Sequence, residues 1–322
     1  MTTAILLLNL GTPDEPTAPA VRRYLAEFLG DPRVVELPRL LWLPILHGII
    51  LRTRPAKSAA KYATIWTTEG SPLKVHTERQ AKLLRGLLGE RGRKELLIDW
   101  AMRYQNPSIP AVLDRLVQQG ATEILILPLY PQYAGSTTAS TQDAVNAWLA
   151  RQKQPPVISW VKEYPTDPGY IGALAASIRE HWVAHGRGEK LIMSFHGIPQ
   201  RSVDRGDPYA SQCHATAQAL AAALDLPPDQ WLATFQSRFG AAKWLQPYTQ
   251  PTLEELARGG MKRVDVLCPG FPADCLETLE EISMECREAF LHAGGETFHY
   301  IPCLNERPDW IAALADICLS RP

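Results

Sequence analysis

The chain has 322 residues, a formal net charge of −1 and a hydrophobic content of 46%. This length exceeds the usual size of one compact core, so we expect two domains of ordinary size. No block of lysine and arginine provides the basic footprint that a phosphate backbone requires, which argues against nucleic acid as a partner.

The first ten residues contain no positive region, and their apolar run is too short for a signal sequence. We therefore expect a cytoplasmic protein. The 6 cysteines include no C-x-x-C pair. In a reducing compartment they are expected to remain thiols, without disulfides or a structural zinc knuckle.

The segment from residue 37 to residue 51 is the most apolar part of the chain. Proline, arginine, histidine and glycine interrupt it, and it is shorter than the ~20 residues that a membrane span needs. Arg52, Arg54, Lys57 and Lys61 follow it. This pattern fits an interfacial segment or the apolar lip of a pocket, and it fits an ordinary core helix with polar ends equally well.

Short β-rich runs alternate with longer amphipathic patterns along the whole chain, which is typical of parallel α/β sheets. Strands are expected near residues 4–9, 95–101, 123–129, 156–161, 190–195, 231–236, 263–268 and 296–301, and helices over 75–88, 109–119, 170–184, 211–224 and 275–293. The strands fall into two sets with similar Gly/Pro exits. We predict two similar doubly wound domains over residues 1–155 and 156–322, with a break at the polar and proline-rich residues 151–156.

Two predicted strand exits carry the residues from which chemistry is expected. His196 ends one apolar run and precedes Gly-Ile-Pro, whereas Glu277 follows the run that begins at Val264. Because carboxyl ends of parallel strands share one edge of a sheet, we expect an imidazole and a carboxylate there. Such a pair can hold a divalent cation and accept protons. A buried histidine and a helix-capping box formed by Asp274 and Glu277 are the structural alternatives.

Glu277, Glu281 and Glu285 recur at every fourth position, with Glu280 and Glu288 beside them. Like charges at this spacing destabilise a helix by about 0.2–0.5 kcal/mol per pair, so the row is a poor solvated face. It could pass cations inwards or protons outwards, and a merely acidic surface helix is the alternative. A π-helical turn would bring more of these carboxylates onto one face, which the sequence does not reveal.

Aromatic residues gather at other predicted strand exits and favour a flat, conjugated ligand, although scattered core filling is the alternative. They are Tyr104, Tyr130, Tyr133, Phe239, Trp244 and Phe271. Arg54, Lys57 and Ser71 could receive carboxylate groups at the rim of such a ligand. The sequence contains no dinucleotide-binding, Walker, nucleophile-elbow or H-E-x-x-H motif.

These residues occur in motifs that resemble those of the ferrochelatase family over essentially the whole chain. The motifs are residues 8–13, 70–73, 129–133 with 136–138, 194–199, 236–240 with Trp244, and 270–281. The resemblance implies an enzyme, a lyase, that inserts Fe(II) into protoporphyrin IX with release of two protons, the last step of haem synthesis. It also implies two Rossmann-like domains, each with a four-stranded parallel sheet flanked by helices, and a porphyrin cleft between them.

The same resemblance implies roles for individual residues. His196 and Glu277 match the metal-binding and catalytic pair of the family, and Glu281 and Glu285 continue its acidic relay. Porphyrin contacts are expected at Arg54, Tyr62, Ser71, Tyr130 and Trp244. Residues 37–65 correspond to the pocket lip, which in some relatives touches the membrane, so a peripheral contact with the inner face of the membrane is expected.

Two departures from the family pattern matter. Some relatives bind a [2Fe–2S] cluster through a cysteine where this chain has Gly135 and through three more in a C-terminal extension. Here only Cys303 and Cys318 lie near the end of the sequence, so we expect no cluster and no required cofactor, with Fe(II) as a substrate. Cys275 stands where many relatives have a histidine, which leaves the role of that position open.

The expected mechanism begins with a porphyrin that is clamped in a bent conformation, which exposes its nitrogen lone pairs. His196 then accepts a pyrrole proton, and Glu277 shares the metal or passes protons to Glu281 and Glu285. The base and metal-ligand roles are interchangeable at this stage. The alternatives are a chelatase for coproporphyrin or a cobalt sirohydrochlorin, and a non-catalytic porphyrin or metal carrier; the long apolar lip favours the less polar protoporphyrin.

Overall fold

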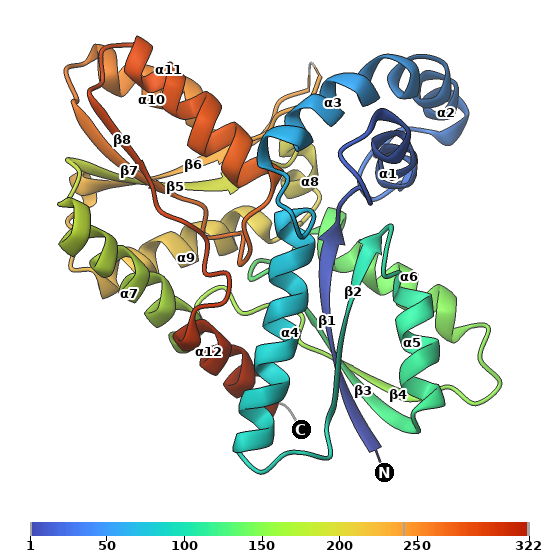
Figure 1. The fold of residues 1–322 in the computed structure, drawn as a ribbon. Helices are drawn as coiled ribbons and strands as arrows, with labels where there is room; N and C mark the ends of the chain where they lie inside the picture. The colour runs from blue at the N-terminus through green and yellow to red at the C-terminus, as the bar shows by residue number, and fades with distance from the viewer. Residues whose placement is uncertain (1, 241, 321–322) are drawn as a thin grey trace. The chain divides into compact units, whose positions relative to one another are not determined.

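The computed structural model describes residues 2–240 and 242–320, which form two compact units. The first unit comprises the described residues up to Glu163 together with those from Leu314 onwards, and the second comprises Tyr164–Ala313. Each unit is built around a 4-stranded sheet whose strands are all parallel (Figure 1). The expected pair of four-stranded, Rossmann-like sheets flanked by helices is confirmed.

The first sheet has the strand order β2-β1-β3-β4. Its strands are β1 (Thr2–Gly11), β2 (Leu97–Tyr104), β3 (Ala121–Pro128) and β4 (Val157–Trp160). β4 pairs with β3 although it follows the proline-rich segment at which the sequence predicts the break between domains. The division therefore falls at Glu163, downstream of the expected boundary.

The first unit also contains a series of helices. They are α1 (Ala18–Gly30), α2 (Arg39–Ile45), the π-helical turn η1 (Leu46–Ile50), α3 (Leu51–Ile65), α4 (Pro72–Glu90), α5 (Ile109–Gln118), the π-helical turn η2 (Gly135–Ala139) and α6 (Ser140–Leu149). On one face of the sheet, Leu6 and Ile126 pack against Leu116 of α5 and Trp148 of α6. Burial on both faces explains why β1 is a continuous apolar run.

The second sheet has the order β6-β5-β7-β8. Its strands are β5 (Lys190–His196), β6 (Trp231–Gln236), β7 (Arg263–Leu267) and β8 (Thr297–Tyr300). The accompanying helices are α7 (Pro168–His185), α8 (Gln200–Asp204), α9 (Tyr209–Ala223), the 3₁₀ turn η3 (Pro228–Gln230), α10 (Thr249–Arg258), the π-helix η4 (Glu277–Cys286) and α11 (Arg287–His292). A last helix, α12, spans Pro308–Leu319.

The two faces of the second sheet carry different side chains. Val264 and Val266 of β7 pack against Leu253 of α10, Ile282 of η4 and Phe290 of α11. Because side chains alternate along a strand, the residue between the two valines points to the opposite face, which α7 covers. Figure 1 shows α7 and α9 on one side of this sheet and α10 and α11 on the other.

The strands predicted from sequence are confirmed, with shifts of a few residues at their ends. The helix predicted over residues 275–293 begins as the π-helix η4 and continues as α11. A search of the described residues finds no helix whose length and apolar content would allow it to cross a membrane.

Candidate active site

His196 is the last residue of β5 and is half-buried. Its Nδ1 atom lies 2.6 Å from the carbonyl oxygen of Gly197, so a proton on Nδ1 is donated there and the lone pair of Nε2 remains available. Glycine is required at position 197 because a Cβ atom would lie 2.8 Å from the backbone oxygen of Gln236 and 3.3 Å from the Trp244 ring. The chain therefore leaves the sheet directly after the imidazole.

The acidic residues belong to η4, which supplies the wide helical turn considered from sequence. Glu277 and Glu281 are half-buried, whereas Glu285 is exposed, so the row leads from a partly buried start to solvent. The carboxylate of Asp274 accepts hydrogen bonds from the Thr278 hydroxyl at 3.0 Å and the Asn305 side-chain amide at 2.6 Å. Asp274 thus fixes the start of the helix by bonding to the Thr278 and Asn305 side chains. The capping box considered from sequence would instead have used the backbone amide of Glu277, and η4 has no side-chain cap of that kind.

Gln236 joins the histidine to the acidic helix. It ends β6 and is the register partner of His196 on β5. Its Nε2 donates to the backbone oxygen of Glu277 at 2.7 Å and to the Glu281 carboxylate at 3.2 Å, while its Oε1 accepts from the Ser194 hydroxyl at 2.7 Å. The imidazole and the beginning of the carboxylate row therefore meet at the carboxyl edge of one sheet.

Glu281 is also held by the residue that follows Gln236. Ser237 donates its backbone N–H to the Glu281 carboxylate at 2.8 Å, and its hydroxyl donates to the same group. Ser237 adopts φ 65° to make these contacts, a conformation that costs a non-glycine residue about 1 kcal/mol or more. Strain of this kind persists where surrounding contacts enforce it, and here it positions two donors on one carboxylate.

The protonation of Glu281 reflects opposing effects. Burial raises the pKa of this carboxyl above its ordinary value and the nearby Glu277 raises it further, whereas the bonds from Ser237 and Gln236 and the proximity of His196 oppose the rise. The net pKa shift is upwards. Glu281 is therefore a carboxyl that can take up and release a proton closer to neutral pH than an exposed glutamate.

Cys275, the departure from the family pattern, is buried two residues before Glu277. Burial raises the pKa of its thiol well above the ordinary value, and the Glu277 carboxylate raises it further. The group thus stays a neutral thiol at physiological pH. It is poorly suited to the metal or base role that an imidazole could take there.

Trp244, the predicted porphyrin contact in the second unit, lies beside the histidine. Residue 244 forms a β-bridge with Pro199, and its ring is the one that a side chain at Gly197 would meet. Its indole N–H donates to the backbone oxygen of Phe239 at 2.9 Å. Phe271 lies on the same edge, with its ring centre 6.5 Å from that of His196.

The other predicted porphyrin contacts lie in the first unit. Arg54 is on α3, and burial lowers the pKa of its guanidinium. Tyr62 is buried on the same helix, with its ring edge-on to that of Tyr24 and the two ring centres 6.4 Å apart. Ser71 is buried directly before α4 and accepts a 2.8 Å hydrogen bond from Thr12. The placement of Tyr62 is that of an aromatic core residue as much as of a contact residue.

Tyr130, two residues beyond β3, differs from these. Its hydroxyl is buried and has no hydrogen-bond partner of good geometry within the described part of the chain. Burial raises the pKa of this hydroxyl, so it remains protonated. Thr141 is the neighbouring side chain, and a buried phenol with no well-formed hydrogen bond among the described residues marks a position where a ligand could supply one.

The apolar segment forms α2, η1 and the start of α3. Large side chains on it are exposed: Leu40 by 91%, Leu41 by 65% and Ile49 by 57%. α2 buries none of its residues. The interpretation of this segment as an ordinary core helix is therefore wrong for α2, because none of its side chains is fully buried and its leucines at 40 and 41 are exposed.

Sequence reasoning assigned no role to Gln236 and Ser237, although both lie in a motif shared with the family. The available signal was a polar pair directly after an apolar strand, as at His196. Only the structure shows that both side chains bind Glu281.

Comparison with known proteins identifies the family of the chain. The model of the family described as ferrochelatase matches residues 2–321. A ferrochelatase from Methylibium petroleiphilum is 66% identical over 316 residues, covering 98% of this chain and 87% of the relative. Another from Aromatoleum aromaticum is 64% identical over 319 residues, covering 99% of this chain and 87% of the relative. The chain belongs to the ferrochelatase family.

Solved structures with a similar fold are more distant in sequence. SirB from Bacillus subtilis with Fe³⁺ aligns with a TM-score of 0.57 at 15% identity, covering 99% of this chain and 95% of that chain. CbiX, described as the terminal enzyme of sirohaem biosynthesis in denitrifying bacteria, aligns with a TM-score of 0.54 at 16% identity, covering 99% of both. These likenesses support the fold, whereas the close relatives confirm the predicted class, a metal chelatase that inserts iron into a porphyrin for haem synthesis.

Proposed function

We propose that His196 and Glu277 are the residues at which Fe(II) enters protoporphyrin IX. The observation that carries this proposal is the Gln236 side chain, which is paired in register with His196 and bonded to both Glu277 and Glu281. An imidazole with a free Nε2 lone pair next to a row of carboxylates combines a base with oxygen ligands for a divalent ion. Fe(II) accepts this mixed ligand set.

The steps follow from what the porphyrin must lose. Its ring nitrogens carry two N–H protons, and a metal ion reaches all the nitrogens only after the ring bends and both protons leave. His196 accepts one proton at Nε2, and Glu277 offers an oxygen to the incoming Fe(II). Glu281, whose pKa is raised by burial, takes up protons and passes them towards the exposed Glu285.

Binding energy from the rest of the macrocycle drives the bending. Arg54 supplies a positive charge for a propionate carboxylate, and Ser71 a hydroxyl. The buried Tyr130 hydroxyl donates to the ligand, and the Trp244 ring stacks on it beside His196. Tyr62, the remaining predicted contact, is held in place by its packing against the Tyr24 ring.

Residues 37–65 are proposed to touch the membrane from its inner face. The exposed leucines of α2 and the basic residues that follow give an apolar surface with a positive border, the combination that binds anionic lipid interfaces. Such a peripheral contact would let a poorly soluble porphyrin pass from lipid to protein without crossing water.

The reaction is proposed to need no resident cofactor and no iron–sulfur cluster. Cluster ligands are thiolates. Burial raises the pKa of Cys303 well above its usual value and that of Cys318 to about 12, and position 135 is a glycine that opens η2. The two cysteines are therefore inert thiols.

Steady-state insertion of Fe(II) into protoporphyrin and coproporphyrin, measured side by side, tests the proposed substrate. We expect repeated turnover with a higher kcat/KM for protoporphyrin. Preference for coproporphyrin would contradict the substrate, and a burst of one metal per chain without turnover would contradict catalysis in favour of a carrier.

A further inference from the structure

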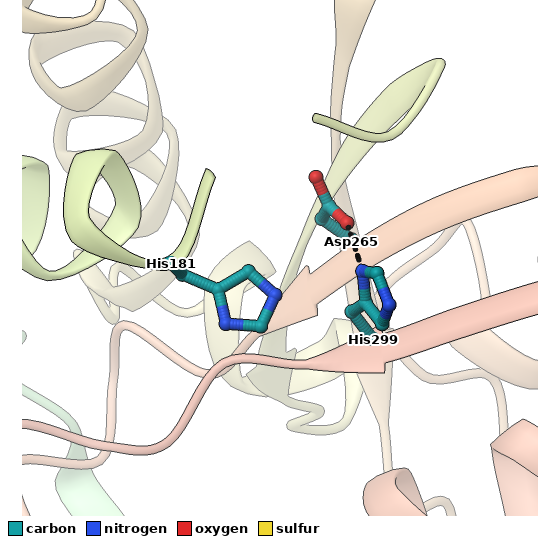
Figure 2. Close-up of side chains that lie close together, drawn as sticks. All are labelled: His181, Asp265 and His299. Carbon is teal, nitrogen blue, oxygen red and sulfur yellow. Dashed lines mark hydrogen bonds and ion pairs between the residues drawn. The ribbon is translucent and has the colours of Figure 1, made fainter. Parts of the chain in front are cut away.

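A second group of metal-ligating side chains lies on the face of the second sheet that α7 covers. Asp265 of β7 and His299 of β8 are register partners, so their side chains stand side by side on that face. His181 reaches them from α7, and Figure 2 shows its ring directed at the other two. One ligand atom from each residue lies within 4.8 Å of those of the other two.

This group is separate from the proposed site of iron insertion. Leu191 is the partner of Asp265 on β5, and His196 lies five residues further along that strand. At about 3.3 Å per residue, this separation is about 16 Å along the strand. Asp265 also points to the sheet face opposite the one packed against η4.

Asp265 is held as a metal-binding carboxylate would be held. It is 1% exposed, and its Oδ2 accepts hydrogen bonds from the Trp182 indole and the Gly188 amide, both at 2.7 Å. Its Oδ1 is hydrogen-bonded to Nδ1 of His299 at 3.2 Å (Figure 2), a bond that an ion between the two atoms would replace. Ligands at about 2.0–2.1 Å from a tetrahedral ion are separated by roughly this distance, and second-shell bonds of this kind orient a ligating oxygen.

His181 supplies an independent observation. Its Nε2 atom is buried and has no hydrogen-bond partner within the described residues. A buried ring nitrogen without a partner costs free energy unless something binds it, and an ion between His181, Asp265 and His299 would do so.

Two neighbours affect the affinity. The ring of His185 stacks on that of His181 with centres 4.4 Å apart, so it packs directly against one of the three side chains. Arg263 opposes a cation, because its guanidinium nitrogen lies 3.5 Å from Nδ1 of His299. The same guanidinium donates to the carbonyl oxygens of His185 and Gly186, which holds it at the edge of the group.

We propose that His181, Asp265 and His299 bind a divalent transition-metal ion. Two imidazoles and one carboxylate, with a further position for water, form a ligand set typical of Zn(II). All three ligands belong to the second unit. The site is distinct from His196 and Glu277, the proposed residues of Fe(II) insertion.

Zinc binding to the full-length chain tests this proposal. The starting variant carries His196→Ala and Glu277→Gln, which remove the proposed insertion site. We expect this variant to retain one tightly bound Zn(II) in equilibrium dialysis and to give the intense visible absorption of tetrahedral Co(II). Absence of bound zinc at micromolar free metal would overturn the proposal.

Single additional changes then locate the ion. His299→Ala should weaken zinc binding by at least about tenfold, and Trp182→Phe, which removes only a donor to Asp265, by about 10–100-fold. The control is His292→Ala, an exposed histidine that ends α11, which should change nothing. Equal zinc affinity in all three variants would refute the assignment; if His299→Ala fails to fold, the comparison of Trp182→Phe with His292→Ala decides the outcome.

Discussion

Replacing Ser237 with alanine tests whether Glu281 carries protons during metal insertion. The Ser237 hydroxyl donates to the Glu281 carboxylate, and a hydrogen bond to a charged group contributes about 1.5–3 kcal/mol. One pKa unit corresponds to about 1.4 kcal/mol, so losing this donor should raise the pKa of Glu281 by a further ~1–2 units. The backbone N–H of residue 237 and the Gln236 amide remain in place.

The expected readout is the pH dependence of the insertion rate, followed by the loss of porphyrin fluorescence. Glu281 must be ionised to accept a proton, so the acid limb of the profile should move to higher pH by ~1–2 units. Ser211→Ala is the matched control, because that hydroxyl donates to the backbone oxygen of Pro208 rather than to a carboxylate. A Ser237→Ala profile that superimposes on those of the control and the wild type would refute the role of Glu281 as a proton carrier.

Two further predictions concern stability and the membrane. Burial tends to raise the pKa of Asp31, but its hydrogen bonds and the Arg103 charge outweigh burial, and the net pKa is lowered. The ionised Asp31 therefore stabilises the folded protein fully above the pKa of the unfolded state. This stabilisation is lost as pH falls through the lower pKa of the folded state. Asp31→Asn should therefore cost about 3 kcal/mol in urea unfolding at neutral pH and less in acid; an equal loss at both pH values would contradict this. The double variant Leu40→Glu with Leu41→Glu should reduce sedimentation with anionic vesicles at least about tenfold. The control Val183→Glu, at a residue about as exposed as Leu40, should leave sedimentation unchanged. Equal sedimentation of all variants would exclude α2 as the membrane contact.

Much of the fold is predictable because parallel strands buried on both faces are continuous apolar runs between glycine and proline. β5 and β7 are therefore found where the sequence places them. The boundary between units is less predictable, because β4 follows a proline-rich segment and still pairs with β3. Local composition marks a break in the chain but does not say which sheet the next strand joins.

The candidate site divides in the same way. His196 and Glu277 can be identified at strand exits, since polar residues that end apolar runs are conspicuous. The π-helical form of η4 has no comparable signal, because it depends on i→i+5 hydrogen bonds rather than on a residue pattern. The bonds of Gln236 and Ser237 to Glu281 depend on register and on a positive φ, which no spacing in the sequence encodes.

The central claim is that His196 and Glu277 act on the metal and the pyrrole protons rather than merely holding the fold. The most direct measurement is the insertion turnover of His196→Ala together with its affinity for protoporphyrin, determined by fluorescence quenching. We predict that turnover is abolished while porphyrin binds within about twofold of the wild-type affinity, since an interaction made only in the transition state leaves ground-state binding unchanged. Retained turnover in this variant would contradict the account.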